Sequence, residues 1–235
     1  MRVKHEIPFN VGMFSDDYIQ TIREAKSPKD FSVRKVKHGF ANEFVLHHHY
    51  LRRKIYIARN VSYGIFSCDY CIGVCMFGFP VWRQYPGLVP PMESSECPEL
   101  IRLCTMSNLP RNTESWFVGK CLRKLVSDWE QEVGVRPKCV TSLCDNALGF
   151  DGAIYKACNF TFHRKTKGRA SNPGGSHGKW GKNDHKQDAE KTMWVYFYDK
   201  QILSVTDITG GDGSFRPREL RFAGDAGSTP ATSTN

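Results

Sequence analysis

The chain has 235 residues, 40% of them hydrophobic and 12% aromatic, which suffices for one sizeable core but is short for two full domains. The formal net charge of +9 favours a polyanionic partner. The longest apolar stretch, at 71–79, is far too short to span a bilayer, and the first thirty residues lack a signal-peptide pattern. These features exclude a membrane partner, and we expect a soluble, cytoplasmic protein.

Nine cysteines form no regular framework, and most of them lie in apolar segments. This pattern is typical of reduced, buried thiols in a reducing compartment. The pair in Cys68-Asp-Tyr-Cys71 has the spacing of a zinc knuckle, but no second pair completes a site. We interpret both residues as core cysteines that flank a tight turn.

The first half of the chain predicts two helices followed by a hairpin. Ser15, followed by two aspartates, is a typical N-cap for a helix over 15–26. Apolar spacing at 42–53 predicts a second short helix. Strands are expected over 55–67 and 71–80, and a proline-rich loop over 80–98.

The second half alternates strands and helices. The pattern predicts a long helix over 112–134, capped by Asn112 or Thr113 and ended by Gly134. A short helix is expected over 152–159, and strands over 99–106, 138–145, 160–166 and 192–199. This order indicates the α/β (α+β) class, with a mixed central sheet and flanking helices.

We therefore expect one catalytic domain over residues 1–208 and a disordered tail over 209–235, because the tail is rich in Gly, Ser, Thr and Pro. A basic loop insertion at about 163–191 holds eight Lys or Arg against three Asp or Glu. With its tryptophan, such a loop can follow a phosphate backbone and stack a base, or it can be a solvated insertion. The candidate DNA-binding residues are Arg164, Lys165, Lys167, Arg169, Lys179, Trp180 and Lys182.

The segment LPRNTES at the start of the long helix is a candidate anion site. A helix N-terminus offers free N–H groups, Arg111 adds a charge, and Thr113 and Ser115 add hydroxyls, so a pyrophosphate could dock there. An ordinary capped helix with an exposed Arg111 explains the same residues.

A second candidate site combines residues from three segments. Asp145 follows an apolar strand and Tyr155 lies on the next helix, where they could act as base orienter and general acid, or equally as a turn cap and a packed ring. Residues 47–50 read His-His-His-Tyr, and because consecutive helical residues point about 100° apart, at most one or two can bind one metal. An exposed polar run remains the alternative.

Together these segments resemble a known family. ELIRLCTMSNLPRNTESWFVGKCLRKL, followed by SLCDNALGFDGAIYKACNFTF and preceded by HHYLRR, is similar to the Mom proteins of phages, which are adenine-modifying enzymes with a fold similar to the GNAT acyltransferases. The resemblance spans about 41–165. Its densest matches are PRN-x-ES and G-x-x-G-x-IY-x-A-x-NF.

The resemblance implies a GNAT-like domain with a mostly antiparallel sheet and a transferase activity that converts adenine in double-stranded DNA to N6-carbamoylmethyl adenine. This modification protects phage DNA from host restriction, so we expect a phage or prophage protein acting in the bacterial cytoplasm. His49, Tyr50, Asp145 and Tyr155 match the catalytic positions, and His49, Tyr50 and Asp145 match a possible iron site. Arg102, Arg111, Asn112 and Ser115 match positions that would face an acyl-CoA-type donor such as acetyl-CoA.

One departure leaves the donor open. Counting from Arg111 places Glu114 where the usual acyl-CoA loop has its first glycine, and a carboxylate there disfavours a pyrophosphate. An ordinary GNAT-type N-acyltransferase acting on a protein or small amine is the alternative function, and an inactive nucleic-acid-binding relative is a third. For the first function, the target adenine has to be flipped out of the duplex.

Overall fold

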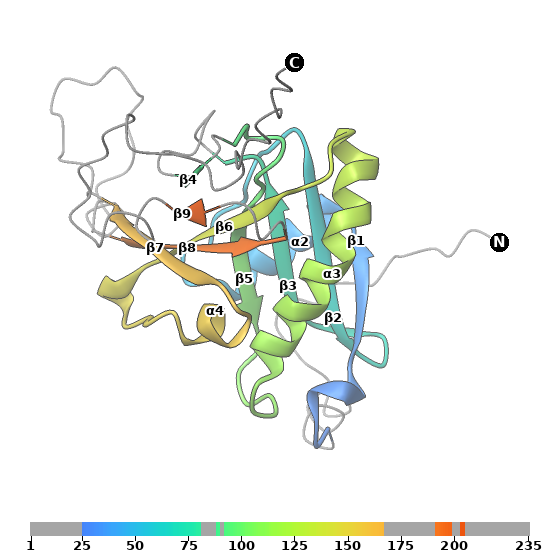
Figure 1. Cartoon of the computed structure of the whole chain (residues 1–235). Coiled ribbons are helices and arrows are strands. Elements are labelled where there is room, and N and C mark those ends of the chain that lie inside the picture. Colours follow the sequence, from blue (N-terminus) through green and yellow to red (C-terminus); the bar gives the residue numbers. More distant parts are fainter. Residues whose placement is uncertain (1–24, 81–87, 90–91, 167–190, 199–202, 205–235) are drawn as a thin grey trace, which may run out of the picture.

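The computed structural model describes residues 25–80, 88–89, 92–166, 191–198 and 203–204. Their elements, in chain order (Figure 1), are η1 (Pro28–Asp30), β1 (Ser32–Val36), α2 (His38–His48), β2 (Asn60–Ser67), β3 (Tyr70–Gly78), β4 (Leu88–Val89), β5 (Glu99–Thr105), α3 (Thr113–Val133), β6 (Cys139–Cys144), η2 (Asn146–Leu148), α4 (Ala153–Ala157), β7 (Thr161–Thr166), β8 (Lys191–Phe197) and β9 (Leu203–Ser204). No helix among these residues is long and apolar enough to cross a membrane.

Seven strands form one sheet in the order β1-β2-β3-β5-β6-β8-β7, and β4 pairs with β9 separately. All neighbours in the large sheet are antiparallel except β5 and β6. The mixed, mostly antiparallel sheet expected from the sequence is confirmed. The parallel pair meets only at Glu99 with Thr141 and at Leu100 with Ser142. Beyond these residues β5 and β6 diverge, and this divergence positions the site described below.

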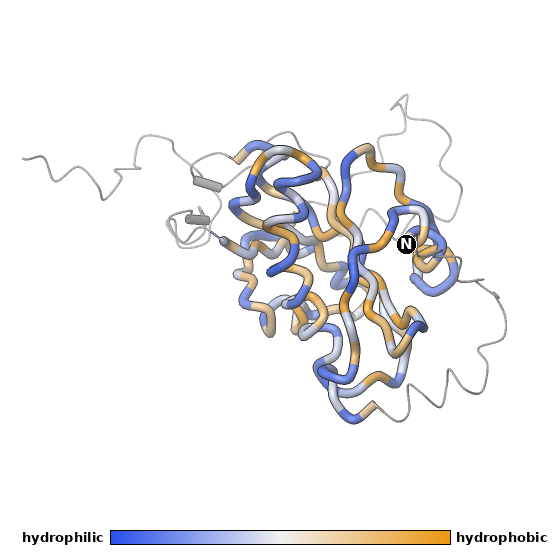
Figure 2. Tube along the Cα trace, turned by 90° about the vertical axis from the view of Figure 1, so that its right-hand side faces the viewer, coloured by the Kyte–Doolittle hydropathy of each residue, from blue (hydrophilic) through white to orange (hydrophobic). Residues whose placement is uncertain are grey.

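Helices cover both faces of the sheet (Figure 1). Successive side chains of a strand point to opposite faces, and β3 is apolar on both. Cys75 and Phe77 belong to the cluster that packs under α3, while Val74 and Met76 pack with α2. In Figure 2 the helical turns alternate between hydrophilic and hydrophobic residues, as expected for helices with one buried face.

Both ends of α3 use left-handed backbone. Gly134 ends the helix at φ 84°, and its N–H donates to Glu130 O, as the sequence predicts. Asn112 occupies the N-cap position at φ 67° but makes no side-chain cap bond. Instead Thr113 Oγ1 donates to Pro110 O at 2.6 Å. The expected side-chain cap is therefore wrong, because the left-handed backbone of Asn112 replaces the extended conformation that capping requires.

Several expected boundaries also move. The helix expected over 42–53 is α2, which runs from His38 to His48. It begins earlier than expected because its buried face already includes Ala41 and Asn42. Strand β1 was not expected; none of its residues is fully buried, and it lies in a basic stretch at the edge of the sheet. Residues 55–59 are not strand, and β4 interrupts the loop expected over 80–98. The tight turn between β2 and β3 is confirmed, but the interpretation of both cysteines as core residues is wrong, because Cys68 lies in the turn and is exposed and Cys71, on β3, is only half-buried.

Three sequence predictions lie wholly or mostly outside the described residues: the helix over 15–26, the basic insertion and the tail over 209–235. Of the first, residues 25 and 26 are described and are not helical. The ends of the insertion are described as well. Residues 163–166 belong to β7 and residue 191 to β8, so the segment between the two strands runs over 167–190.

Candidate functional site

A cavity of about 240 Å³ lies where β5 and β6 diverge. Its walls come from the turn after α2, from β5, from the end of β6 with the loop that leads into α4, and from the first residue of β8. The lining residues are His49, Tyr50, Leu51, Leu100, Ile101, Arg102, Leu103, Leu143, Cys144, Asp145, Gly149, Phe150, Asp151, Gly152, Ala153, Ile154, Tyr155 and Lys191. All three segments of the second candidate site thus reach one cavity.

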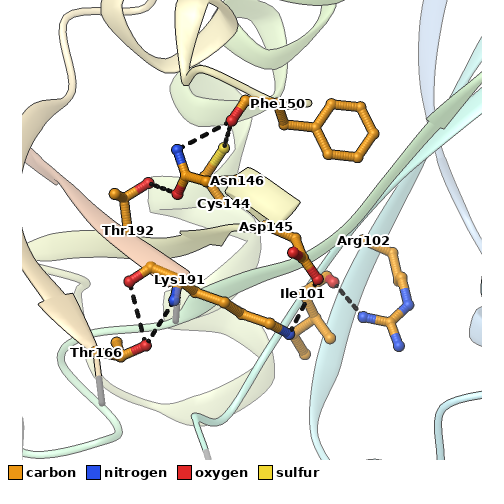
Figure 3. A network of polar contacts seen from close by, with 9 residues as sticks. All are labelled: Ile101, Arg102, Cys144, Asp145, Asn146, Phe150, Thr166, Lys191 and Thr192. Carbon is orange, nitrogen blue, oxygen red and sulfur yellow. Dashed lines mark hydrogen bonds and ion pairs between the residues drawn. The ribbon is translucent and has the colours of Figure 1, made fainter. Parts of the chain in front are cut away.

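Asp145 is the buried acid of this cavity. It directly follows β6 and is 7% exposed. Its Oδ2 lies 3.9 Å from Nζ of Lys191, the outer limit of an ion pair (Figure 3). Oδ1 is buried and has no hydrogen-bond partner among the described residues. Since a buried, unpaired carboxylate oxygen is costly, a polar ligand is the expected partner of Oδ1.

Two hydrogen bonds between the backbone of Lys191 and Thr166 hold Lys191 at the wall of the cavity. Its N–H donates to Thr166 Oγ1 at 3.1 Å, and the same hydroxyl donates to Lys191 O at 3.2 Å (Figure 3). Thr166 thereby fixes the point where β7 and β8 begin to pair. Sequence reasoning counted Lys191 only as one charge of the basic segment. The signal that could have found it is its place directly before the apolar strand predicted over 192–199.

Arg102, on β5, is a second cation of the cavity. Nη1 donates to Ile101 O at 2.8 Å, and the buried Nε has no partner among the described residues (Figure 3). Burial lowers the pKa of Arg102, although an arginine starts so high that it stays protonated. The lining carries two cations, Arg102 and Lys191, and two carboxylates, Asp145 and Asp151, and it includes a donor and an acceptor with no partner among the described residues. It suits a ligand that has both kinds of hydrogen-bonding group.

Tyr155 lies on α4 and reaches back to β6. Its Oη lies 2.9 Å from Ser142 Oγ, which also lies 3.1 Å from Leu100 O. The carbonyl can only accept, so when Ser142 donates to it, the Tyr155 hydroxyl is free to donate to Ser142. Burial raises the pKa of Tyr155. The phenol is therefore a protonated group in a hydrogen-bonded chain, as a general acid requires.

A row of three aromatic rings forms another wall. The rings of His49 and Tyr50 stack at 4.2 Å between centroids, and Tyr50 faces Phe150 at 5.9 Å. His49 Nδ1 accepts the N–H of Leu51 at 3.1 Å, which leaves the proton of the neutral ring on Nε2. Burial, assisted by the charge of Arg102, lowers the pKa of His49 to about 4, so the imidazole is neutral near pH 7. Of the three consecutive histidines, only His49 lines the cavity.

Hydrogen bonds fix the loop that carries Phe150. Cys144 Sγ and Asn146 Nδ2 donate to Phe150 O at 3.4 and 3.1 Å, respectively. Thr192 Oγ1 donates to Asn146 Oδ1 at 2.9 Å, which ties the loop to β8 (Figure 3). Gly152, at φ 78°, lies against Trp194, where an added Cβ would meet the indole ring at 2.4 Å. The glycine and the polar contacts together hold Asp145 and Phe150 on the same cavity.

The predicted anion site at the start of α3 is separate from this cavity. Arg111 and Asn112 are exposed, and neither they nor Ser115 line it. Ser115 Oγ donates to Asn112 O at 3.2 Å, and Glu114 Oε1 accepts from Thr105 Oγ1 at 3.2 Å. The structure brings only Arg102 of the four predicted donor-binding residues to the cavity. A donor contact at Arg111, Asn112 and Ser115 stays a prediction.

The possible iron site gains no support. Among the described residues, no group of three or more His, Cys, Asp and Glu side chains could hold a metal ion. His49 and Asp145 supply two such ligands. The third predicted ligand, Tyr50, lines the same cavity. The described residues therefore give the predicted iron centre no support.

The predicted DNA contacts fall mostly outside the described residues. Lys167, Arg169, Lys179, Trp180 and Lys182 all lie there. Arg164 and Lys165 are on β7, the edge strand of the sheet. Lys165 is exposed, whereas Arg164 is half-buried with a buried Nε that has no partner among the described residues. Their role in binding DNA stays a prediction.

Solved acetyltransferase structures show a similar arrangement of the chain. A GNAT family acetyltransferase from Elizabethkingia anophelis with acetyl-CoA bound aligns at 9% identity and a TM-score of 0.46, covering 72% of this chain and 98% of its own. A Bacillus subtilis acetyltransferase in complex with CoA aligns at 10% identity and a TM-score of 0.46, covering 71% and 97%, respectively. The IAA acetyltransferase of Bacillus cereus aligns at 13% identity and a TM-score of 0.45, covering 71% of this chain and 99% of its own.

No curated protein matches the sequence. The model of the Mom protein family, however, matches residues 30–206, a range that contains every residue lining the cavity. This match confirms the family suggested by the motifs around LPRNTES and CDNALGFDGAIY. The chain belongs to the Mom protein family.

Proposed function

We propose that this protein is a transferase that modifies adenine in DNA, converting it to N6-carbamoylmethyl adenine and so protecting the DNA from host restriction. The observation that carries the proposal is the family match over residues 30–206, which includes the whole cavity. His49, Tyr50, Asp145 and Tyr155, which the motif resemblance assigns to the catalytic site, all line that one cavity.

Asp145 is the proposed acceptor for the exocyclic amine of the base. The N6 nitrogen of adenine carries two protons and is a weak nucleophile, so a neighbouring acceptor helps when a new bond forms there. The partnerless Oδ1 can accept an N–H hydrogen bond from the amine. Burial of Asp145 strengthens this bond, because a hydrogen bond is stronger where the local dielectric constant is low.

Tyr155 is the proposed general acid. It stays protonated near pH 7 because burial raises its pKa. When its proton leaves toward a departing group, Ser142 Oγ, at 2.9 Å, can donate to the phenolate by turning its hydroxyl away from Leu100 O. The resulting phenolate would thus be stabilised by a donor already in contact with it.

The donor of the transferred group is proposed to be acyl-CoA-like, with acetyl-CoA as the first compound to test. Arg102 and Lys191 are two cations of the cavity lining that can contact a phosphate-bearing or carbonyl donor, while Asp145 and Asp151 balance their charge. Addition of a CH2–CO–NH2 group is not a simple acyl transfer, so the reacting part of the donor is left open. Glu114 at the start of α3 argues against the usual pyrophosphate contact there.

The test is nucleoside mass spectrometry of DNA from bacterial cells that express the full chain. We expect a modified deoxyadenosine with the mass of a carbamoylmethyl adduct, and its loss in Asp145→Ala and Tyr155→Phe. Tyr56→Leu, which changes an aromatic side chain that is 88% exposed and lies outside the cavity, is the control. Absence of any modified nucleoside, together with acetylation of small amines from acetyl-CoA, would favour an ordinary N-acyltransferase instead.

A further inference from the structure

Two large hydrophobic side chains are exposed at the cavity. Tyr50 is 51% exposed and Phe150 is 48% exposed, and both line it. The other exposed large hydrophobics in the described part of the chain, Tyr56, Tyr70 and Phe162, do not. Phe150 has no polar atom on its ring that could gain from water, so its exposure beside a cavity indicates a ligand surface.

The exposure of Phe150 is built into the loop. Its carbonyl accepts from both Cys144 and Asn146, and Asn146 is in turn held by Thr192 of β8. Gly149, at φ 83°, turns the chain directly before it. The backbone is therefore fixed on both sides of a side chain that extends the row from His49 through Tyr50.

The polar groups of the same cavity match the edge of a nucleobase. Within the described part of the chain, Asp145 Oδ1 accepts no hydrogen bond and Arg102 Nε donates none. A base offers donors and acceptors along its edge and an aromatic face above and below, and such a face stacks on phenylalanine without regard to sequence. The two cations add attraction for the phosphates of the strand.

We propose that Phe150 is a stacking residue for the extruded base. The base then lies beyond Phe150 and continues the row of rings formed by His49, Tyr50 and Phe150. This assignment rests on the proposed function and gives the substrate side of that site. The rings of Tyr50 and Phe150 are 5.9 Å apart, whereas a base between them needs about 7 Å, twice a contact distance of about 3.5 Å. The base therefore stacks on Phe150 rather than between the two rings.

The test compares two DNA strands that carry the same phosphates. One is an adenine-containing single strand, and the other has abasic sites in place of the adenines. The full wild-type chain should bind the adenine strand more tightly. Phe150→Leu, which keeps apolar bulk but removes the ring, should lower affinity for the adenine strand about 5- to 150-fold and leave affinity for the abasic strand unchanged.

Controls separate stacking from folding. Phe150→Tyr retains a ring and should keep the preference for adenine, and Tyr56→Leu, which removes an exposed ring that does not line the cavity, should keep it too. If Phe150→Leu fails to fold, it loses affinity for both strands, and Phe150→Tyr then decides the question. If Phe150→Tyr binds both strands alike, or if the wild-type chain shows no preference for the adenine strand, the assignment is overturned.

The result is independent of the modification itself. If cells expressing the wild-type chain contain modified adenine while Phe150→Leu keeps the preference for the adenine strand, the stacking role fails and the proposed function stands. If the preference depends on Phe150 but no modified adenine forms, the function fails and the base site stands.

Discussion

Nζ of Lys191 and Oδ2 of Asp145 lie 3.9 Å apart, while the other carboxylate oxygen is buried with no partner among the described residues (Figure 3). The acid follows β6 and the lysine begins β8, so the two meet across the end of an antiparallel ladder in which Cys144 pairs with Thr192. A buried charge that is only loosely paired is a poor contributor to stability. It is, however, well placed to accept a hydrogen bond from a ligand.

Replacing the acid by its neutral isostere should therefore separate stability from function. Asp145→Asn is expected to abolish adenine modification and to leave the free energy of unfolding unchanged or raised by about 0.5–2 kcal/mol. Lys191, with a side chain that is 27% exposed, can then turn to water. Urea denaturation and nucleoside mass spectrometry of the same variant give both readings. A drop in stability of more than about 1 kcal/mol would mean that the carboxylate is structural.

Removing the lysine instead of the acid should lower the free energy of unfolding. Lys191→Met leaves Asp145 buried without a cation and should lower the free energy of unfolding by about 1–2 kcal/mol, between the limits for surface and buried pairs. Lys191→Arg keeps the charge and serves as the matched control. In the double variant Asp145→Asn/Lys191→Met, the cost of removing the lysine should largely disappear, as read from urea denaturation. An undiminished cost would show that Lys191 acts through packing.

The hydrogen-bonded chain from Leu100 through Ser142 to Tyr155 predicts unequal effects of its two hydroxyls. Ser142→Ala leaves the buried Tyr155 hydroxyl without its partner and should cost about 1–3 kcal/mol. Tyr155→Phe leaves Ser142 bonded to the carbonyl and should cost only about 0.5–1.5 kcal/mol, although it should abolish modification. Chemical denaturation of both variants tests the order, and equal costs would contradict it.

The sequence predicted the elements that local patterns determine. The helix of α3, with seven buried residues on one face and Gly134 at its end, was placed to within a residue at each end. The pattern placed Asp145 at the end of an apolar strand and Tyr155 on the next helix but left their roles open, and the family resemblance singled them out. The divergence of β5 and β6, which creates the cavity, depends on pairing between distant segments and leaves no periodic signal.

The same limit explains the site residues that were missed. Lys191 reaches the cavity through the pairing of β8 with β6 and through its two bonds to Thr166, none of which is local in sequence. Phe150 reads as a loop phenylalanine until its neighbours are known. Conversely, the run LPRNTES has the local features of an anion site, yet its hydroxyls bond within their own turn.

The two left-handed glycines around Phe150 allow a matched comparison. In Gly149→Ala no atom lies within 4 Å of the new Cβ, so the free energy of unfolding should fall only by the cost of holding alanine in left-handed backbone, about 1–2 kcal/mol. Gly152→Ala meets the Trp194 ring at 2.4 Å as well, and overpacking adds about 1–3 kcal/mol. The difference in thermal midpoint between the variants measures the contact with Trp194. Equal midpoints would show that the indole moves aside freely.

The neutral state of His49 predicts a pH dependence of stability. Its pKa is about 4 in the folded chain because of burial and the charge of Arg102, against 6.5 for an exposed histidine. Between these values the unfolded chain binds a proton that the folded chain does not, so the free energy of unfolding should fall as the pH is lowered from about 6.5 to about 4. Below that range both states are protonated and the contribution is constant.

The variant His49→Gln isolates this contribution, since the amide does not titrate and can still accept the Leu51 N–H. The wild-type minus variant difference in free energy of unfolding should decline with falling pH by at most about 1.4 kcal/mol per pH unit, and should be flat above about pH 7. Urea denaturation at a series of pH values gives the curve. A difference that grows as the pH falls would mean that His49 is protonated in the folded chain, and that a negative charge of the cavity, with Asp145 the nearest candidate, pairs with it.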